Sequence, residues 1–288
     1  MSTKRQVFSL ISIDSKLYAI GGWDGNYLNS VETYDTQTNQ WKPIASMNQL
    51  RGYNDATVID NTIYICGGRN NNISKSCEYY LPNTDEWSFT TPMIEERYGL
   101  ALVSHDGLMY AIGGKSGNEI VDTMERLDTT TQQWQPMKHM RYPRYLFGSA
   151  SFMGKIYVCG GVGYNDWKSC ETYDPKTNKW TVIAPMLSTR YQFKLIAFND
   201  KLYALGGYTN VIDGVIDTVE TYDYKLNQWS YTTSLPLKMA GFGSRDLSRH
   251  TQPEICPTVD LAEDRPIIAF AEDQLRLVLN NITVDTMK

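Results

Sequence analysis

The side chains of this sequence that could carry out chemistry are three histidines, five cysteines and a glutamate that recurs along the chain. His105, His139 and His250 belong to no H-x-H or H-E-x-x-H metal-binding motif, and the chain has no G-x-S-x-G nucleophile motif. Catalysis needs several such groups to converge on one site. We therefore expect no catalytic residue, no metal site and no cofactor.

Four of the cysteines form two pairs with the same spacing. Cys66 and Cys77 are 11 residues apart, as are Cys159 and Cys170, and each pair is expected on neighbouring antiparallel strands. Such a pair could form a cross-strand disulfide or a redox sensor. The favoured interpretation is that they are small buried thiols that fill strand positions, because free cysteine is among the most buried residues. Neither spacing resembles a zinc site.

A glutamate occurs once in each of five similar stretches, at Glu32, Glu78, Glu125, Glu171 and Glu220. Paired carboxylates can act as general acid and base. Here every glutamate stands two residues before a tyrosine or, once, a leucine, at Tyr34, Tyr80, Leu127, Tyr173 and Tyr222. Because the placement repeats, we expect these glutamates to accept hydrogen bonds from backbone N–H groups or to pair with an arginine between neighbouring copies.

Further families of residues keep the same register, which predicts a repeat protein. Glycine pairs recur every 46 or 47 residues, beginning at Gly21, Gly67, Gly113, Gly160 and Gly206. A tryptophan follows each pair, at Trp41, Trp87, Trp134, Trp180 and Trp229. An arginine stands 16 residues before each pair, at Arg5, Arg51, Arg97, Arg144 and Arg190.

Each copy has the pattern of four short β-strands. In the fourth copy these are expected at Phe147–Phe152, Ile156–Cys159, Ser169–Tyr173 and Lys179–Ile183. The glycine pair ends the second strand, where the backbone needs positive φ or close approach. A left-handed turn is expected two residues before each tryptophan, a position that suits Asn and Asp and is less comfortable for Gln132. The residues there are Asn39, Asp85, Gln132, Asn178 and Asn227.

One four-stranded sheet cannot bury two apolar faces by itself. We expect the sheets to stack face to face around an axis, as the blades of an all-β propeller. The tyrosine of the third strand and the tryptophan of the fourth would then pack between blades, each burying about 150–250 Å².

The succession of glycine pair, E-T-Y-D, T-N-x-W, P-M and arginine resembles the kelch repeat from about Lys4 to Met239. Copies with Pro-Met before the arginine, such as Pro185-Met186 before Arg190, resemble the kelch domains of BTB-kelch proteins. In those proteins a BTB module docks a cullin-based ubiquitin ligase, and the kelch propeller selects the substrate. Kelch-like propellers also include copper oxidases, but no histidines group near a tyrosine here as those enzymes require.

The resemblance divides residues 1–238 into five kelch repeats, at about residues 4–46, 47–93, 94–140, 141–186 and 187–238. Residues 239–288 are expected to be a degenerate sixth repeat or an irregular tail, because Met239 replaces the arginine and no glycine pair follows. The ring is then five-bladed, closed by a degenerate sixth blade, or open, and a truncated or misread gene product is a further alternative. Since Arg5 already belongs to the first repeat, we expect no BTB module in the chain.

Charge and hydropathy exclude several classes of partner. With 27 basic and 32 acidic residues the chain has a net charge of −5, which gives no electrostatic footprint for nucleic acid. No apolar run is long enough to span a membrane, and the apolar stretch at the N-terminus is too short for a secretory signal. We expect a cytoplasmic protein, associated with the cytoskeleton if it binds actin.

Two sets of loops should emerge on one face of the propeller, around its central channel. The loops between one copy and the next carry arginines and tyrosines, residues that anchor protein interfaces. The candidates are Arg51, Tyr53, Arg97, Tyr98, Arg144, Tyr145, Arg190 and Tyr191. The alternative is a framework role, above all for the arginines, through pairing with the strand glutamates.

The second set of loops follows the glycine pairs and differs from copy to copy, as expected of binding loops on a constant scaffold. Its candidate contact residues are Trp23, Arg69, Asn70, Tyr164, Trp167 and Tyr208. Trp23 and Trp167 lie off the fourth strands and are expected to be partly exposed. The resemblance to kelch substrate receptors implies that both loop sets hold a short, often acidic, peptide, whose carboxylates the arginines would bind.

The sequence therefore predicts a protein-binding module and not an enzyme. The favoured role is substrate recognition in a BTB-kelch type adaptor for a cullin-based ubiquitin ligase, reached through a BTB module outside this chain. The first alternative is an actin-binding or cytoskeletal scaffold, and the least favoured is a propeller enzyme such as a copper oxidase. The expected partner is a protein or peptide, with acidic segments preferred.

Overall fold

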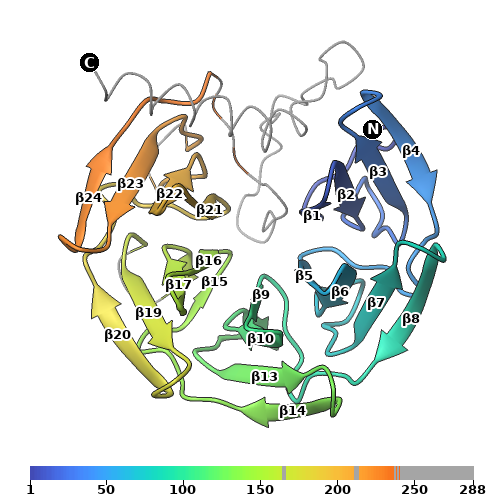
Figure 1. The fold of residues 1–288 in the computed structure, drawn as a ribbon, viewed down its shortest axis with the longest axis horizontal. Coiled ribbons are helices and arrows are strands. Elements are labelled where there is room, and N and C mark those ends of the chain that lie inside the picture. Colours follow the sequence, from blue (N-terminus) through green and yellow to red (C-terminus); the bar gives the residue numbers. More distant parts are fainter. Residues whose placement is uncertain (164–166, 211–213, 237, 239, 241–288) are drawn as a thin grey trace.

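The computed structural model describes residues 1–163, 167–210, 214–236, 238 and 240. Within that part the chain is all-β, as predicted, and five four-stranded antiparallel sheets lie around a central channel as the blades of a propeller (Figure 1). No helix in the described part is long and apolar enough to cross a membrane. The expected sixth repeat or tail, residues 239–288, lies almost wholly outside the described residues.

The strands of each blade follow one another from the channel outward. Blade one holds β1 (Ser9–Ile13), β2 (Lys16–Ile20), β3 (Val31–Asp35) and β4 (Gln40–Ile44). Blade two holds β5 (Asp55–Ile59), β6 (Thr62–Cys66), β7 (Cys77–Leu81) and β8 (Glu86–Thr90). Blade three holds β9 (Ala101–His105), β10 (Leu108–Ile112), β13 (Met124–Asp128) and β14 (Gln133–Pro136).

Blade four holds β16 (Gly148–Phe152), β17 (Lys155–Cys159), β19 (Cys170–Asp174) and β20 (Lys179–Ile183), within one residue of the predicted bounds. Blade five holds β21 (Lys194–Phe198), β22 (Lys201–Leu205), β23 (Val219–Asp223) and β24 (Gln228–Tyr231). Two small ladders lie outside the blades and pair β11 (Lys115–Ser116) with β12 (Glu119–Ile120), and β15 (Arg144–Tyr145) with β18 (Val162–Gly163).

The glycine pairs have the conformation that the sequence predicts. Gly160 and Gly161 have φ values of 63° and 85°. A Cβ on Gly160 would lie 2.4 Å from the carbonyl oxygen of Arg190, and one on Gly161 would lie 2.8 Å from that of Tyr145. Glycine is required because the loops that enter this blade and the next both pass directly against this turn.

The turn between the third and fourth strands also follows the prediction. Its left-handed residue has φ of 55° at Asn39, 52° at Asn178 and 56° at Gln132. The side-chain oxygen of Asn178 accepts a hydrogen bond of 2.9 Å from the Tyr173 hydroxyl in the same blade. Asparagine or aspartate therefore stabilises the turn twice, through its backbone and through the packing tyrosine.

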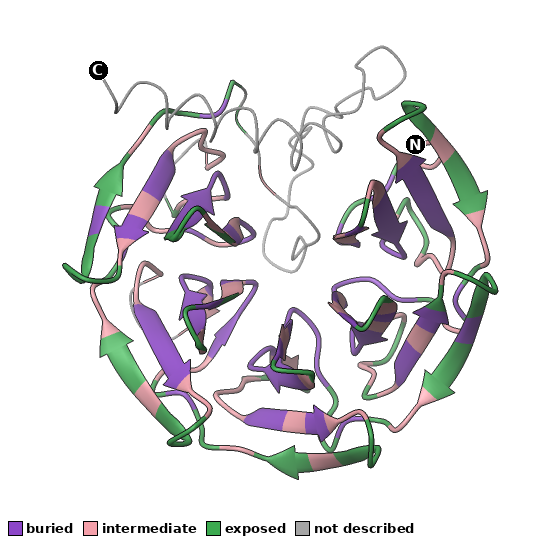
Figure 2. Ribbon diagram, viewed as in Figure 1, coloured by how far each residue is buried: buried purple, intermediate pink, exposed green. Residues whose placement is uncertain are grey.

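The cores lie between the blades, which confirms the expected role of the repeated aromatics. Tyr173 packs edge-on to Tyr110 of the preceding blade, with ring centroids 6.1 Å apart, and against Trp180 of its own blade. The indole Nε1 of Trp180 donates to the Lys138 carbonyl, in the loop from the preceding blade, at 2.8 Å. Burial accordingly falls from the inner strands to the outermost strand of each blade (Figure 2).

The cysteine pairs correct the favoured interpretation. Cys66 is joined to Cys77, and Cys159 to Cys170, as cross-strand disulfides and not as thiols. The residues stand opposite each other with Cα atoms 4.2 Å apart, the close type of antiparallel pairing. Nothing in the spacing of 11 residues reveals which type of pairing brings the sulfur atoms together, so the sequence does not decide between the two states.

Because of its buried tyrosines, the folded protein should be less stable at high pH. Burial raises the pKa of Tyr173 and of Tyr222 to about 12, above the value of about 10 in an unfolded chain. The folded protein therefore holds these protons more firmly, so the stabilisation is complete below pH 10 and is lost as the pH rises towards 12. Urea unfolding should give a lower free energy of unfolding at pH 11 than at pH 9. Equal values would contradict this account.

Candidate partner-binding face

A buried arginine–glutamate pair fixes each loop that enters a blade. In blade four the Nη1 of Arg144 donates to the carbonyl oxygens of Gly160 at 2.7 Å and Ser169 at 3.0 Å. Its Nη2 forms an ion pair with Glu171 at 3.0 Å. The same contacts recur at Arg5, Arg51 and Arg190. In blade three Nη1 of Arg97 makes the same two carbonyl bonds, but the ion pair with Glu125 comes from its Nε, at 3.2 Å. The bond to the first glycine explains the constant spacing of 16 residues.

The glutamate also receives the backbone of the entering loop. The Glu171 carboxylate accepts hydrogen bonds from the N–H groups of Arg141 at 2.8 Å and Tyr142 at 3.3 Å. Both roles expected of the glutamates, as acceptors for backbone donors and as partners of an arginine, are present in every described blade.

Because of these contacts, the arginines are buried and are not part of the candidate binding surface. The residues Arg51, Arg97, Arg144 and Arg190 are at most 1% exposed. Burial lowers the pKa of the Arg144 guanidinium, and the adjacent Glu171 opposes that change. A carboxylate of a partner cannot reach a guanidinium that is enclosed and already bonded. The framework alternative is therefore the one that the structure supports, and these four arginines are withdrawn as partner contacts.

The two loop sets lie side by side, as predicted. The N–H of Gly52 donates to the Arg69 carbonyl at 2.9 Å, and the Arg69 N–H donates back to Gly52 at 2.7 Å. Equivalent bridges join Gln6 to Trp23, Tyr98 to Lys115, Tyr145 to Val162 and Tyr191 to Tyr208. In each blade the variable loop is therefore tied by its backbone to the entering loop, which leaves its side chains free to vary.

The tyrosines of the entering loops form an aromatic belt, which we define as Tyr53, Tyr98, Tyr145 and Tyr191. Ring centroids are 5.8 Å apart for Tyr53 and Tyr98 and 6.3 Å apart for Tyr98 and Tyr145, in edge-to-face geometry. The first three are 5–8% exposed, whereas Tyr191 is half-buried. The belt is largely a support on which the side chains of the second loop set rest.

Cations from the second loop set lie over the belt. The Arg69 guanidinium carbon is 5.3 Å from the centre of the Tyr98 ring, and the Lys115 ammonium is 5.8 Å from that of Tyr145. A cation over an aromatic face gains about 0.5–1 kcal/mol at an exposed site. Lys115 is absent from the predicted contact residues. Its position in the repeat could have identified it, because it follows the glycine pair of blade three as Arg69 follows that of blade two.

The other predicted contacts of the second loop set lie at the same channel mouth. Trp23, Asn70, Trp167 and Tyr208 are all half-buried, as expected for the two tryptophans. Trp167 packs edge-on to Tyr191 at 5.5 Å, and Tyr191 stacks on Tyr208 at 5.2 Å. The remaining candidate, Tyr164, lies outside the described residues.

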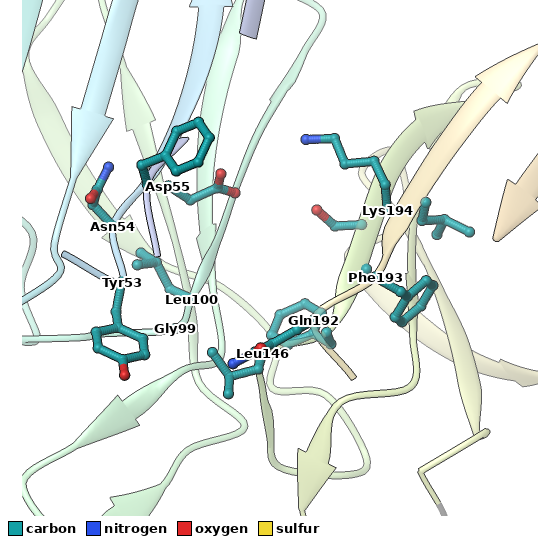
Figure 3. A pocket seen from close by; sticks show the side chains of 14 residues that line it. Tyr53, Asn54, Asp55, Gly99, Leu100, Leu146, Gln192, Phe193 and Lys194 are labelled. Carbon is teal, nitrogen blue, oxygen red and sulfur yellow. The ribbon is translucent and has the colours of Figure 1, made fainter. Parts of the chain in front are cut away.

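The channel itself holds a polar cavity of about 80 Å³ (Figure 3). Asp55, at the start of β5, and Lys194, at the start of β21, point towards each other across it (Figure 3). Burial raises the pKa of the Asp55 carboxyl, and the Lys194 ammonium acts in the opposite direction. Asp55 also accepts a hydrogen bond of 2.8 Å from the Leu102 N–H. Side chains of both signs are thus available beneath the channel mouth.

Side chains that could bind a metal ion do not cluster in the described residues. No cluster of three His, Cys, Asp or Glu side chains there could hold a metal ion. Ser151 lies 2.8 Å from Nδ1 of His105, whose Nε2 is 3.4 Å from Asp106. Because the Asp106 carboxylate is 81% exposed, water screens its charge from the imidazole. We interpret this contact as part of the packing between blades three and four.

Comparison with known proteins agrees with the geometry. Residues 7–207 match the model of the KLHDC2/KLHL20/DRC7 Kelch-repeats domain, and residues 189–236 match the Kelch motif. The chain belongs to the kelch-repeat family. The solved structure titled "Structure of YjhT" superposes with a TM-score of 0.71 at 16% identity, covering 83% of this chain and 86% of that one. At that identity the likeness shows the fold alone.

Curated relatives share short stretches with this kelch chain. Kelch-like protein 4 of Homo sapiens is 43% identical over 49 residues, which are 17% of this chain and 7% of that protein. Kelch-like protein 33 of Homo sapiens is 44% identical over 48 residues, 16% of this chain and 9% of that protein. The matches thus span less than a tenth of the length of either relative.

Loss of one framework arginine should destabilise the whole kelch domain. Arg144→Met leaves the Glu171 carboxylate buried without its ion pair, and we expect the free energy of unfolding to fall by about 3–5 kcal/mol. Urea denaturation measures this value. Arg141→Met, at an exposed arginine in the same loop, is the matched control and should change it by less than about 0.5 kcal/mol. Similar values for the two variants would show that the ion pair is dispensable.

Proposed function

We propose that this kelch propeller binds a peptide segment of a partner protein at its channel mouth. Kelch propellers are a protein-interaction fold, and kelch-family homologues are mainly interaction modules without enzymatic activity. The observation that carries the proposal is the contrast between two layers. The arginine–glutamate pairs recur in all five described blades, whereas the half-buried side chains of the second loop set differ from blade to blade.

The contact residues we propose form the channel-mouth face, defined as Trp23, Arg69, Asn70, Lys115, Trp167, Tyr191 and Tyr208. Aromatic side chains give large contact area at modest entropic cost, and Arg is enriched at interface hot spots. The positive charges of Arg69 and Lys115 favour a segment with Asp or Glu. Lys194 in the channel below offers a further positive group to a side chain that reaches inward.

The biological role we propose is substrate recognition for a cullin-based ubiquitin ligase. The support is the family membership together with the likeness to Kelch-like proteins 4 and 33. The link to the ligase would run through a BTB module, which the described residues do not contain. None of the described contacts favours actin, so actin is an outcome that the partner test distinguishes.

We place this function in the cytoplasm. A reducing cytosol opens most disulfides, and the two cysteine pairs would then return to thiols. The blades tolerate this because Ile20 and Val31 fill the equivalent opposed positions in blade one, where no covalent bond is present. The disulfides are therefore compatible with, but not required for, a cytoplasmic propeller.

Truncation of Arg69 should weaken binding without unfolding the domain. We expect Arg69→Ala to lower the affinity for an acidic peptide about tenfold, the effect of a hot-spot side chain. Fluorescence anisotropy with labelled peptides, one rich in Asp and Glu and one with Asn and Gln in their place, measures both affinity and charge preference. The melting temperature should change by no more than about 3 °C.

A control variant and the identification of partners accompany this test. Lys201→Ala removes an exposed cation at the start of β22, the end opposite the glycine pair, and should leave the affinity unchanged. Affinity-purified partners of the wild-type chain and of Arg69→Ala then identify the pathway. A partner that Arg69→Ala loses and that is itself ubiquitinated by a cullin-based ligase supports the ligase role, whereas recovery of actin in its place would contradict that role.

A further inference from the structure

Two side chains of opposite charge lie inside the central channel without forming an ion pair. Asp55 and Lys194 line the cavity of about 80 Å³ and point towards each other across it (Figure 3). Among the described residues neither side chain has an ion-pair partner, whereas the framework arginines meet their glutamates at 2.9–3.2 Å. Both side chains are half-buried, so water and small solutes reach them. A charge of each sign is therefore available to a ligand in this cavity.

The two charges depart from the pattern of the repeat. Each stands four residues after the framework arginine of its blade, where the other three blades have small uncharged residues. Those residues are Ser9, Ala101 and Gly148. Three blades thus form with no charge at this position. Departures from a local pattern that the fold does not require are expected at functional sites.

A third polar group of the cavity wall is not used by the framework. Gln192 is 5% exposed, and neither Nε2 nor Oε1 of its amide has a hydrogen-bond partner in the described part of the chain. The backbone N–H of Gln192 donates to the Leu146 carbonyl at 2.8 Å, as the equivalent N–H groups of blades two to four do to the blade before them. The side chain lines the cavity and extends from blade five towards Leu146 (Figure 3). A buried amide without partners is unfavourable, so a ligand that bonds to it gains affinity.

The amide of Gln192 can turn towards the cavity. Rotation about the last bond of a glutamine side chain has broad, shallow preferences, so Nε2 and Oε1 reach the cavity surface at little cost. The equivalent residues of the other blades have no amide, and they are Val7, Tyr53, Gly99 and Leu146. Blades two and five together therefore give this cavity a carboxylate, an ammonium, and an amide that both donates and accepts.

The size and charges of the cavity define the ligand. At about 10–15 Å³ for each water, its volume gives room for about five to eight water-sized positions. An anion bound to Lys194 would face the Asp55 carboxylate, and a cation bound to Asp55 would face the Lys194 ammonium. A ligand with a single charge is thus repelled by one wall. A small zwitterion places each of its charges against the opposite charge of the protein.

We propose that the channel cavity binds a free α-amino acid about as large as glycine or alanine. The ammonium of the ligand donates to the Asp55 carboxylate and to Oε1 of Gln192. The carboxylate of the ligand accepts hydrogen bonds from the Lys194 ammonium and from Nε2 of Gln192. The site lies beneath the channel-mouth face and does not rest on peptide binding there, so either function can fail without the other.

The first test compares three small solutes on the full 288-residue chain without any peptide. Free glycine, acetate and methylammonium are titrated at equal ionic strength, with saturation-transfer NMR for contact and calorimetry for the Kd. We expect a Kd of about 1 mM for glycine, well within the ceiling for a ligand of this size. Acetate and methylammonium should bind at least about tenfold more weakly, because each meets a like charge.

Two results of this comparison would overturn the proposal. Absence of saturation transfer to glycine at tens of millimolar would show that water alone fills the cavity. Acetate that binds as tightly as glycine would show a site for an anion, such as the carboxylate of a partner side chain, and not for a zwitterion.

A matched pair of lysine variants locates the site. Lys194→Met removes the ammonium but keeps most of the aliphatic stem, and it should weaken glycine binding at least about tenfold. Lys201→Met makes the same change at an exposed lysine of the same blade and should leave the Kd unchanged. Equal Kd values for the two variants would contradict binding in the channel.

A glutamine variant separates ligand binding from stability. Leu146 has φ of 57° at the position where Gln192 has φ of 51°, so the backbone accepts Gln192→Leu. Because the substitution removes a buried amide without partners, the melting temperature should stay the same or rise, while glycine binding weakens about threefold to tenfold. A lower melting temperature would show that the framework uses the amide, and undiminished glycine binding would overturn the contacts assigned to Gln192.

Discussion

The fold depends on a buried ion pair that recurs in every described blade. The arginine of the entering loop binds the glutamate of the third strand and the carbonyl oxygen of the glycine 16 residues later. Two charges inside a protein are costly unless further hydrogen bonds satisfy them. Here backbone carbonyls and N–H groups do so, and the result is a rigid corner that sets where each blade begins.

That corner decides which part of the molecule can recognise a partner. The arginines of the entering loops are buried in ion pairs with the strand glutamates. The positive charge at the channel mouth is therefore provided by Arg69 and Lys115, which lie over the aromatic belt. Each variable loop is anchored by two backbone hydrogen bonds to the entering loop. Side chains above the anchor can therefore change without disturbing a blade, which is the property that a binding scaffold needs.

Much of the fold could be predicted from the sequence because each feature is local. The strands of the fourth repeat, the left-handed turn residue and the glycine pair depend on residues within one copy. The pairing of glutamate with arginine was also predictable, since both recur in one register. The burial of the arginines was harder to predict, because it depends on how closely neighbouring loops pack. At Gly160, for example, a Cβ atom would lie only 2.4 Å from the carbonyl oxygen of Arg190.

The sequence by itself determined that this is a kelch-type array of four-stranded blades, because period and spacing report interactions within and between equivalent copies. Only the tertiary structure decided that the arginines are internal, that the cysteines bond across strands, and that Lys115 joins Arg69 at the channel mouth. The reason is physical, since burial, sulfur-to-sulfur approach and the placing of one loop beside another depend on distances between segments far apart in the chain.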